Sequence, residues 1–244
     1  MRYLVLSDIH SNLEALEEAL RFKDYDEILV LGDLVGYGAN PNECVERVRA
    51  LQPRAVIRGN HDKVACGIDN GDFFVSHALV AAIWTREQLS DDNIDYLRNL
   101  VAGPLAIDEY VTIAHGAPGD EDTYILSPQE AENHFWQFTT PICLIGHTHV
   151  AQLYAMNKMK LDVAAASDGL QLELVLDGVH RYILNPGSVG QPRDGDSRGA
   201  FMVLDTTKRI AEYHRFVYDI ATAQTKIRNA GMPEFLAQRL AQGR

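Results

Sequence analysis

Short polar motifs with the residue types of metal sites recur between residues 8 and 149. The motifs are Asp8-Ile9-His10, Gly32-Asp33, Gly59-Asn60-His61-Asp62, Ala114-His115-Gly116 and Gly146-His147-Thr148-His149. Their side chains offer oxygen and imidazole ligands without sulfur, a mixture that suits Mn, Fe, Zn, Ni or Co better than Ca or Mg. Because these ligands outnumber those of one site with an open position, they favour two ions about 3.5–4 Å apart that share a carboxylate.

The spacing inside two of these motifs is also informative. Asp8 and His10 are two positions apart, and so are His147 and His149. In an extended segment, this spacing puts both side chains on the same side of the chain. One such pair alone is more often a turn beside a surface histidine, and Gly-Asp alone is a common turn. The metal interpretation is favoured because the motifs occur together, each at the end of a predicted strand.

The segments that precede the first motifs are typical of buried strands. Residues 2–7, 27–31 and 55–57 are short apolar runs, and helices are expected between them over residues 12–22 and 40–51. This β-α-β-α-β order predicts right-handed crossovers and a mostly parallel sheet. Ligand sites in open α/β sheets lie at the carboxyl ends of strands, so the motifs should meet at one edge.

The rest of the chain shows a change from helices to strands. Helices are expected over residues 76–89 and 91–100 and from Ser127, and strands within residues 105–114 and 141–145. Further strands are expected over residues 151–156, 171–176, 180–184, 200–204 and 208–217. Asp177-Gly178 predicts a hairpin turn between two of them. We predict one domain over residues 1–217 and a C-terminal helical extension over residues 218–244 that packs on the same domain.

Composition limits the classes of partner. The 244 residues are 46% hydrophobic and 23% charged, which is the range of globular proteins. The net charge of −12 argues against broad binding to nucleic acid or to an anionic membrane, although one phosphate could still bind at a local positive site. No apolar run reaches the roughly 18 residues of a membrane span. Three cysteines without a C-x-x-C spacing predict no disulfide framework and favour the cytoplasm.

The complete series resembles the motifs of the calcineurin-like metallophosphoesterases. It is continued by Asn185-Pro186-Gly187-Ser188, which is similar to the small prokaryotic phosphodiesterase branch, so the resemblance covers residues 1–217. It implies an α/β fold, a four-layer α/β/β/α sandwich with two packed mixed sheets. It also implies a dinuclear metal-dependent hydrolase that acts on a small phosphate-ester substrate. Manganese is the expected metal, with Fe, Zn, Ni or Co as alternatives.

The resemblance also implies a role for each motif residue. One ion would be held by Asp8, His10, Asp33 and His149, and the second by Asp33, Asn60, His115 and His147. Asp33 would bridge the ions, and a hydroxide bridging them would be the nucleophile. His61 would face the substrate and donate a proton to the leaving group, and Asp62 would orient His61.

For a few other residues, the sequence allows both a structural role and a role in substrate binding. Asn12 is either a helix cap or a substrate contact, and Tyr37, in a loop after Asp33, could contact a phosphate or a base. Arg58 is either a phosphate clamp or an exposed strand residue. The specificity pocket is expected to come from residues of about 34–40, 62–100 and 116–127.

Among activities, a phosphodiesterase is preferred, with a nucleotide or dinucleoside polyphosphate phosphohydrolase as the nearest alternative. A protein phosphatase is disfavoured because residues 34–37 lack the arginine that the protein Ser/Thr phosphatase branch carries in this loop. A non-catalytic scaffold is disfavoured because every ligand and His61 are present. A homo-oligomer is left open because exposed sheet edges can pair with a second chain.

Overall fold

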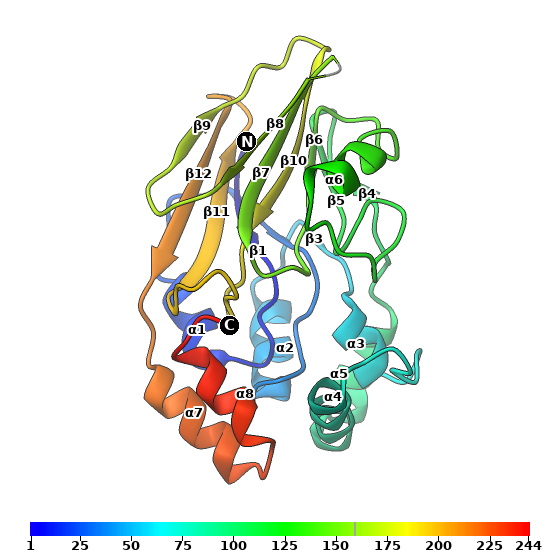
Figure 1. Ribbon diagram of the computed structural model, residues 1–244. Helices are drawn as coiled ribbons and strands as arrows, with labels where there is room; N and C mark the ends of the chain where they lie inside the picture. Colours follow the sequence, from blue (N-terminus) through cyan, green and yellow to red (C-terminus); the bar gives the residue numbers. More distant parts are fainter. Residues whose placement is uncertain (159) are drawn as a thin grey trace.

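The computed structural model describes residues 1–158 and 160–244. Two six-stranded sheets pack face to face, and helices lie outside them (Figure 1). The first sheet has the strand order β3-β2-β1-β11-β12-β9, and the second has the order β4-β5-β6-β10-β7-β8. Each sheet contains parallel and antiparallel pairs. The predicted α/β architecture with two packed mixed sheets is confirmed.

The first sheet begins with the three predicted parallel strands. They are β1 (Arg2–Leu6), β2 (Glu27–Val30) and β3 (Ala55–Val56), with the crossover helices α1 (Leu13–Ala19) and α2 (Pro41–Ala50) between them. The other edge of β1 pairs with an antiparallel group made of β11 (Gly199–Asp205), β12 (Ile210–Phe216) and β9 (Gln171–Glu173). The chain's first strand therefore lies at the centre of this sheet.

The second sheet is built from the middle of the chain. Its strands are β4 (Leu105–Ala106), β5 (Val111–Ile113), β6 (Ile142–Leu144), β7 (Ala151–Asn157), β8 (Lys160–Ala165) and β10 (His180–Pro186). β10 runs parallel to β6 and antiparallel to β7, which makes this sheet mixed.

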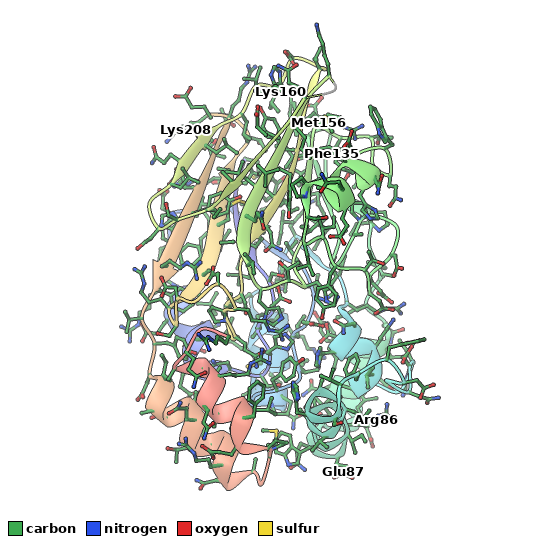
Figure 2. All side chains as sticks on the ribbon, in the orientation of Figure 1. Arg86, Glu87, Phe135, Met156, Lys160 and Lys208 are labelled. Atoms are coloured by element: carbon green, nitrogen blue, oxygen red, sulfur yellow. The ribbon has the colours of Figure 1, made fainter. Side chains whose placement is uncertain are left out.

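Alternation along the strands divides the apolar side chains into layers. Val5 of β1 packs between the two sheets with Ile113 of β5, while Leu4 and Leu6 on the opposite face pack against helices. On the outer face of the second sheet, Phe135 and Met156 belong to a further apolar cluster (Figure 2). Helix, sheet, sheet and helix thus form four layers.

Five of the remaining helices surround the end of the molecule where the first strands finish, namely α3 (Asn60–Ala65), α4 (Ser76–Gln88), α5 (Asp91–Arg98), α7 (Ile220–Asn229) and α8 (Glu234–Leu240). Helix α6 (Pro128–His134) lies instead beside the second sheet, where it contacts β8 (Figure 1). Helices α7 and α8 lie beside α1, at the end opposite to the N-terminus (Figure 1). Ile227 and Leu236 join the same apolar cluster as Leu16 of α1. The division of the chain into domains stays a prediction.

Two local predictions differ from the structure. Asp177-Gly178 does not close a hairpin, because β9 before it pairs with β12 in the first sheet, whereas β10 after it belongs to the second sheet. Strand β8 was not predicted, since only alternate residues of it are even half-buried and its apolar pattern is weak. Within the described residues, no helix combines the length and the apolar character needed to cross a membrane.

Candidate metal centre

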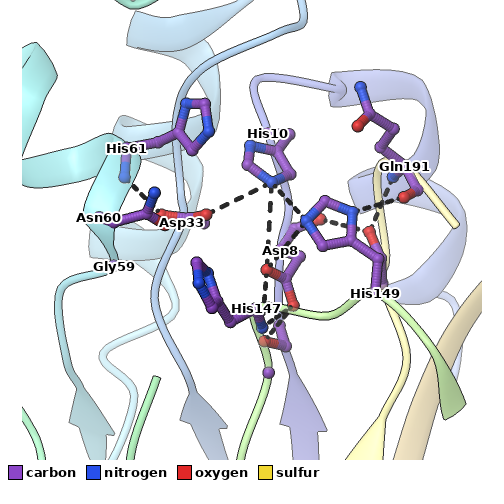
Figure 3. A network of polar contacts seen from close by, with 12 residues as sticks. Asp8, His10, Asp33, Gly59, Asn60, His61, His147, His149 and Gln191 are labelled. Atoms are coloured by element: carbon purple, nitrogen blue, oxygen red, sulfur yellow. Dashed lines mark hydrogen bonds and ion pairs between the residues drawn. The ribbon is translucent and has the colours of Figure 1, made fainter. Parts of the chain in front are cut away.

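The predicted motifs converge at the carboxyl ends of strands from both sheets. Asp8 follows β1 and Asp33 follows β2, while Asn60 begins α3 after β3. His115 follows β5, and the loop after β6 carries the last motif. Figure 3 shows the side chains of six of these residues pointing toward one another, namely Asp8, His10, Asp33, Asn60, His147 and His149. All of the predicted ligands are buried, namely Asp8, His10, Asp33, Asn60, His115, His147 and His149.

The first cluster brings together Asp8, His10, Asp33 and His149, whose ligand atoms all lie within 4.8 Å of one another. His10 Nε2 is 3.4 Å from Asp33 Oδ2, and His149 Nε2 is 3.4 Å from Asp8 Oδ1. The two imidazole Nε2 atoms are 3.1 Å apart. Two buried nitrogens this close to two carboxylates form a set that can hold one divalent cation.

The second cluster shares Asp33 with the first. The ligand atoms of Asp33, His115 and His147 lie within 4.8 Å of one another, and Asn60 Oδ1 is 3.2 Å from His115 Nε2. Asp33 Oδ2 is 3.4 Å from His115 Nε2 and equally far from His10 Nε2. This buried oxygen has no hydrogen-bond partner in the described part of the chain, whereas Asp33 Oδ1 accepts from the His61 N–H at 2.9 Å. An oxygen left unpaired between two ligand sets fits a carboxylate shared by two ions.

Main-chain carbonyls orient the imidazole rings. The Nδ1 atoms of His10, His115 and His149 lie 3.0, 2.8 and 2.6 Å from main-chain oxygens to which they can donate. Donation from Nδ1 leaves the Nε2 lone pair free for a metal ion. His147 is the reverse case, because its Nε2 lies 3.1 Å from the Asp122 oxygen and Nδ1 is left as the ligand atom.

Neighbouring imidazoles stabilise the charged form of the shared carboxylate. Burial opposes ionisation of Asp33, but the neighbouring His115 and His61 outweigh it and hold the Asp33 pKa well below its usual range. Burial likewise opposes protonation of His115, but Asp33 outweighs it and raises the pKa of His115 to about 10. Divalent ions in this position would supply the same compensation without a proton.

The backbone at the ligands is left-handed rather than extended. Asp8, His10, Asp33, His147 and His149 have φ values of 53°, 50°, 53°, 66° and 60°. The extended geometry expected for the two i, i+2 pairs is therefore wrong. Asp8 and His10 still reach the same cluster, whereas His149 reaches the first cluster and His147 the second. Such conformations cost about 1–3 kcal/mol each and persist where the surroundings impose them. Here the His10 N–H donates to the Asp33 carbonyl at 2.9 Å.

His61 lies beside the ligands without belonging to either cluster. Its ring is 4.9 Å from the His10 ring and 4.3 Å from the Tyr37 ring, and its Nδ1 is buried without a partner among the residues described. Burial, reinforced by the charge of Arg193, lowers the pKa of His61 to about 4. The Asp62 oxygens accept from the main-chain N–H groups of Gly59 and Val35, at 2.9 and 3.1 Å, so Asp62 fixes the start of α3, the helix that carries His61. The role of Asp62 in orienting the His61 ring stays a prediction.

For two further residues, the structure decides between the two interpretations that the sequence allowed. Asn12 Oδ1 accepts from the Ala15 N–H at 3.2 Å, so Asn12 caps α1. Arg58 binds Glu121 through two hydrogen bonds of 3.1 Å, so its guanidinium already has a carboxylate partner. Neither residue is a free substrate contact.

A cavity of about 500 Å³ opens over the second cluster. Asn60, His61 and His147 line it, together with Tyr37, Lys63, Asp69, Gly71, Phe73, Phe74, Val75, Ala78, Asp120, Asp122 and Tyr124. Apart from Asn60, His61 and His147, these residues fall within the ranges expected for the specificity pocket. Tyr37 was named from the sequence as a candidate contact, whereas Phe73, Phe74 and Tyr124 were not predicted individually, because no motif marks them. Tyr124 stacks on the His147 ring with centroids 3.8 Å apart, so the pocket wall touches a candidate ligand.

Comparison with known proteins agrees with this geometry. A family model described as the calcineurin-like phosphoesterase superfamily domain matches residues 1–209. The chain belongs to this superfamily. A metallophosphoesterase from Sphaerobacter thermophilus has a similar structure, with a TM-score of 0.86, 38% identity and coverage of 100% of both chains. An uncharacterized protein from Methanocaldococcus jannaschii is 36% identical over 249 residues, covering 98% of this chain and 97% of that protein.

A shorter similarity concerns a protein with a named substrate class. Over 67 residues, 25% of each chain, the sequence is 39% identical to a symmetrical bis(5'-nucleosyl)-tetraphosphatase from Glaesserella parasuis. Membership of the calcineurin-like phosphoesterases indicates a divalent-metal-dependent phosphoester hydrolase, and the two clusters are the groups that could hold the ions.

Proposed function

We propose that the protein hydrolyses phosphodiesters with two divalent ions, manganese being the preferred metal. One ion would be held by Asp8, His10, Asp33 and His149, and the other by Asp33, Asn60, His115 and His147. The observation that carries this proposal is the unpaired Oδ2 of Asp33, which lies 3.4 Å from a histidine Nε2 of each ligand set. When bound, the ions would supply Lewis acidity that activates water and neutralises phosphoryl oxygens.

His61 is the residue that would move a proton. Its ring lines the cavity, and Tyr37 and Phe74 pack against it with centroids 4.3 and 4.6 Å away. The low pKa of the buried ring means that the proton is held weakly in the absence of an anion. A phosphate bound beside the ring would favour the charged imidazolium, which could then donate to the leaving oxygen.

A small ester fits this cavity better than a nucleic acid strand does. Asp69, Asp120 and Asp122 line the cavity, and the ammonium group of Lys63 is already paired with Asp122 and Glu121. Such acidic walls oppose a long polyanion, which needs a row of free cations. We place the activity in the cytoplasm, because all three cysteines are free and buried. Self-association stays a prediction.

A second candidate is a nucleotide or dinucleoside polyphosphate phosphohydrolase. Aromatic rings surround the cavity, with Phe73 fully exposed at its wall and Tyr124 43% exposed. Exposed rings of this kind can stack on a nucleobase. The local similarity to a tetraphosphatase supports the same substrate class.

The test is hydrolysis of bis(4-nitrophenyl) phosphate by protein saturated with manganese. We expect turnover that is lost on chelation and restored when manganese is added back. A parallel panel of phosphomonoesters, cyclic nucleotides and dinucleoside polyphosphates would rank the substrate classes. Hydrolysis that survives complete chelation, or no hydrolysis of any ester in the panel, would contradict the proposal.

A further inference from the structure

Two arginines outside all of the metal motifs lie over the ring of Tyr37. The guanidinium carbon of Arg193 is 5.5 Å from the ring centroid, and that of Arg239 is 5.7 Å away. Arg193 follows β10 and Arg239 belongs to α8, so two distant parts of the chain meet here. Because the Tyr37 ring also packs 4.7 Å from His10 and 4.3 Å from His61, the two arginines stand next to the reaction centre.

Neither arginine pairs with an Asp or Glu side chain within residues 1–158 and 160–244. Arg193 donates from Nε and Nη2 to the side-chain oxygen of Gln191, at 3.3 and 2.8 Å. Arg239 donates from Nε to a main-chain oxygen of Arg244. The other side-chain partners of the two guanidinium groups are phenol groups, Tyr124 for Arg193 and Tyr37 for Arg239.

Two other arginines nearby do form ion pairs with aspartate side chains. Arg198 is 2.8 Å from both Asp168 and Asp196, and Arg215 of β12 binds Asp194. The acidic side chains of this region are thus taken by other arginines. In the part of the chain described, Arg193 and Arg239 are left as a positive pair without an acidic side chain as partner.

Such a pair is costly unless an anion joins it. Arg239 is only 8% exposed, and burial, followed by the charge of Arg193, lowers the pKa of Arg239 to about 10. The charge of Arg193 also acts on Tyr124, which lines the cavity, and on His61. Two neighbouring guanidinium groups without an acidic side chain as partner suit the oxygens of a phosphate group, which such groups can bind in a bidentate manner.

We propose that Arg193 and Arg239 form a second phosphate subsite, which binds the phosphate next to the one that is hydrolysed. The inference rests on the proposed phosphoester hydrolysis and deepens it, because it names a substrate class. That class is esters with a further phosphate in line, such as nucleoside or dinucleoside polyphosphates. Helix α8 then becomes part of the substrate site.

Hydrolysis of such a substrate needs water and no other reactant. The oxygen of water bonds to the scissile phosphorus, and the bond from that phosphorus to the bridging oxygen breaks. The departing phosphate keeps the electron pair, and both protons of the water pass to the products or the solvent. The arginine pair would neutralise the charge that grows on the departing phosphate.

The experiment compares two substrates in the variants Arg193→Gln and Arg239→Met, with excess manganese. For a dinucleoside tetraphosphate, we expect kcat/KM to fall about tenfold or more in each variant, as expected when a hydrogen bond to a charged group is lost. For bis(4-nitrophenyl) phosphate, we expect little change. The matched control is Arg228→Gln, an exposed arginine of α7 that pairs with Glu234, and it should change neither value.

A second measurement does not depend on turnover. In calorimetric titrations of manganese-saturated protein, imidodiphosphate should bind more tightly than orthophosphate, and both variants should lose that preference. If Arg239→Met fails to fold, as thermal unfolding would show, Arg193→Gln decides alone. Equal losses on both substrates, or no loss on either, would overturn the subsite. Failure of the unsubstituted protein to hydrolyse either substrate would overturn the proposed function instead, while the titrations would still test the subsite.

Discussion

Asp33 is the side chain on which both ligand clusters depend. In the substitution Asp33→Asn, one negative charge is lost and the amide nitrogen cannot act as a second bridging oxygen. We expect manganese-saturated protein to fall below two ions per chain, together with the loss of most diester hydrolysis. Elemental analysis and the hydrolysis rate measure the two effects.

The matched control for this substitution is Asn12→Ala. Asn12 caps α1 and faces Gly190, so its loss should lower stability by about 1 kcal/mol and leave the metal content intact. Equal losses of activity in the two metal-saturated variants would mean that Asp33 is not the bridge.

For His61 we expect a different result, because His61 is not a metal ligand in either cluster. His61→Ala should retain both ions and lose about 10²–10⁴-fold in rate on alkyl esters, whose leaving groups need a proton. The loss should be much smaller on nitrophenyl esters, which leave without protonation. Rates on the two ester types, with elemental analysis of the same samples, provide the test.

An equal fractional loss on both ester types would reassign His61 to substrate binding. Empty metal sites in the variant would reassign it to ligation. His134→Ala, which removes a histidine remote from both clusters, serves as the control for loss of an imidazole.

The ligand residues could be predicted from the sequence because they occur in short runs with glycines beside them. Arg193, Arg239 and Tyr124 could not be predicted in the same way. Each is isolated in the sequence, and only the packing of the C-terminal helices and the loops brings it to the Tyr37 ring or the cavity. The chemistry of the metal centre is thus local in the sequence, and the determinants of specificity are not.

At the scale of elements, the loop after β6 must approach β1 closely. A Cβ at Gly146 would lie 2.0 Å from Ser7 Oγ and 2.8 Å from Asp8 Oδ2, distances that real Cβ atoms do not show. We expect Gly146→Ala to displace this loop with its ligand His147, and so to reduce metal content and activity. Elemental analysis and thermal unfolding measure the effect.

Gly178→Ala is the control for this glycine. Gly178 has a φ of +81° with no atom within 4 Å of an added Cβ, so only the backbone strain of about 1–2 kcal/mol should appear. Full metal content in the Gly146 variant would show that the loop can shift without moving its ligands.

The helices and strands that could be predicted are those whose sequence pattern depends only on neighbouring residues. The apolar runs of β1 and β2 predicted buried strands, and Ser127 predicted the start of α6, where it forms a capping box with Glu130. The turn at residues 177–178 was misinterpreted, because the partner of β9 is the distant strand β12. Turn chemistry gives the position of a reversal but not the sheet that each flanking segment joins.

At the scale of the whole molecule, the candidate centre spans the two sheets. Asp8 and Asp33 follow strands of the first sheet, whereas His115 and His147 follow strands of the second. Ions bound to both sets would tie the sheets together and stabilise only the folded protein, by about 2.7 kcal/mol at a free metal concentration a hundred times the Kd. We expect chelation to lower Tm, measured by thermal unfolding.

Asp33→Asn gives the control, because its Tm should change little on chelation. An identical Tm for the unsubstituted protein with and without manganese would contradict the proposal that the ions link the sheets. A drop of equal size in the variant would instead point to metal bound elsewhere on the chain.

The central position of β1 has a consequence for the order of events during synthesis. Asp8 leaves the ribosome early, yet its carbonyl accepts from the Ser188 hydroxyl and the Gly190 N–H, and β1 completes its pairing only with β11. At about 5–20 residues per second, the ribosome needs on the order of ten seconds or more to deliver those partners. The first half of the centre is therefore incomplete on the nascent chain, and we expect metal to be bound in its final geometry only after the residues of β11 have been synthesised.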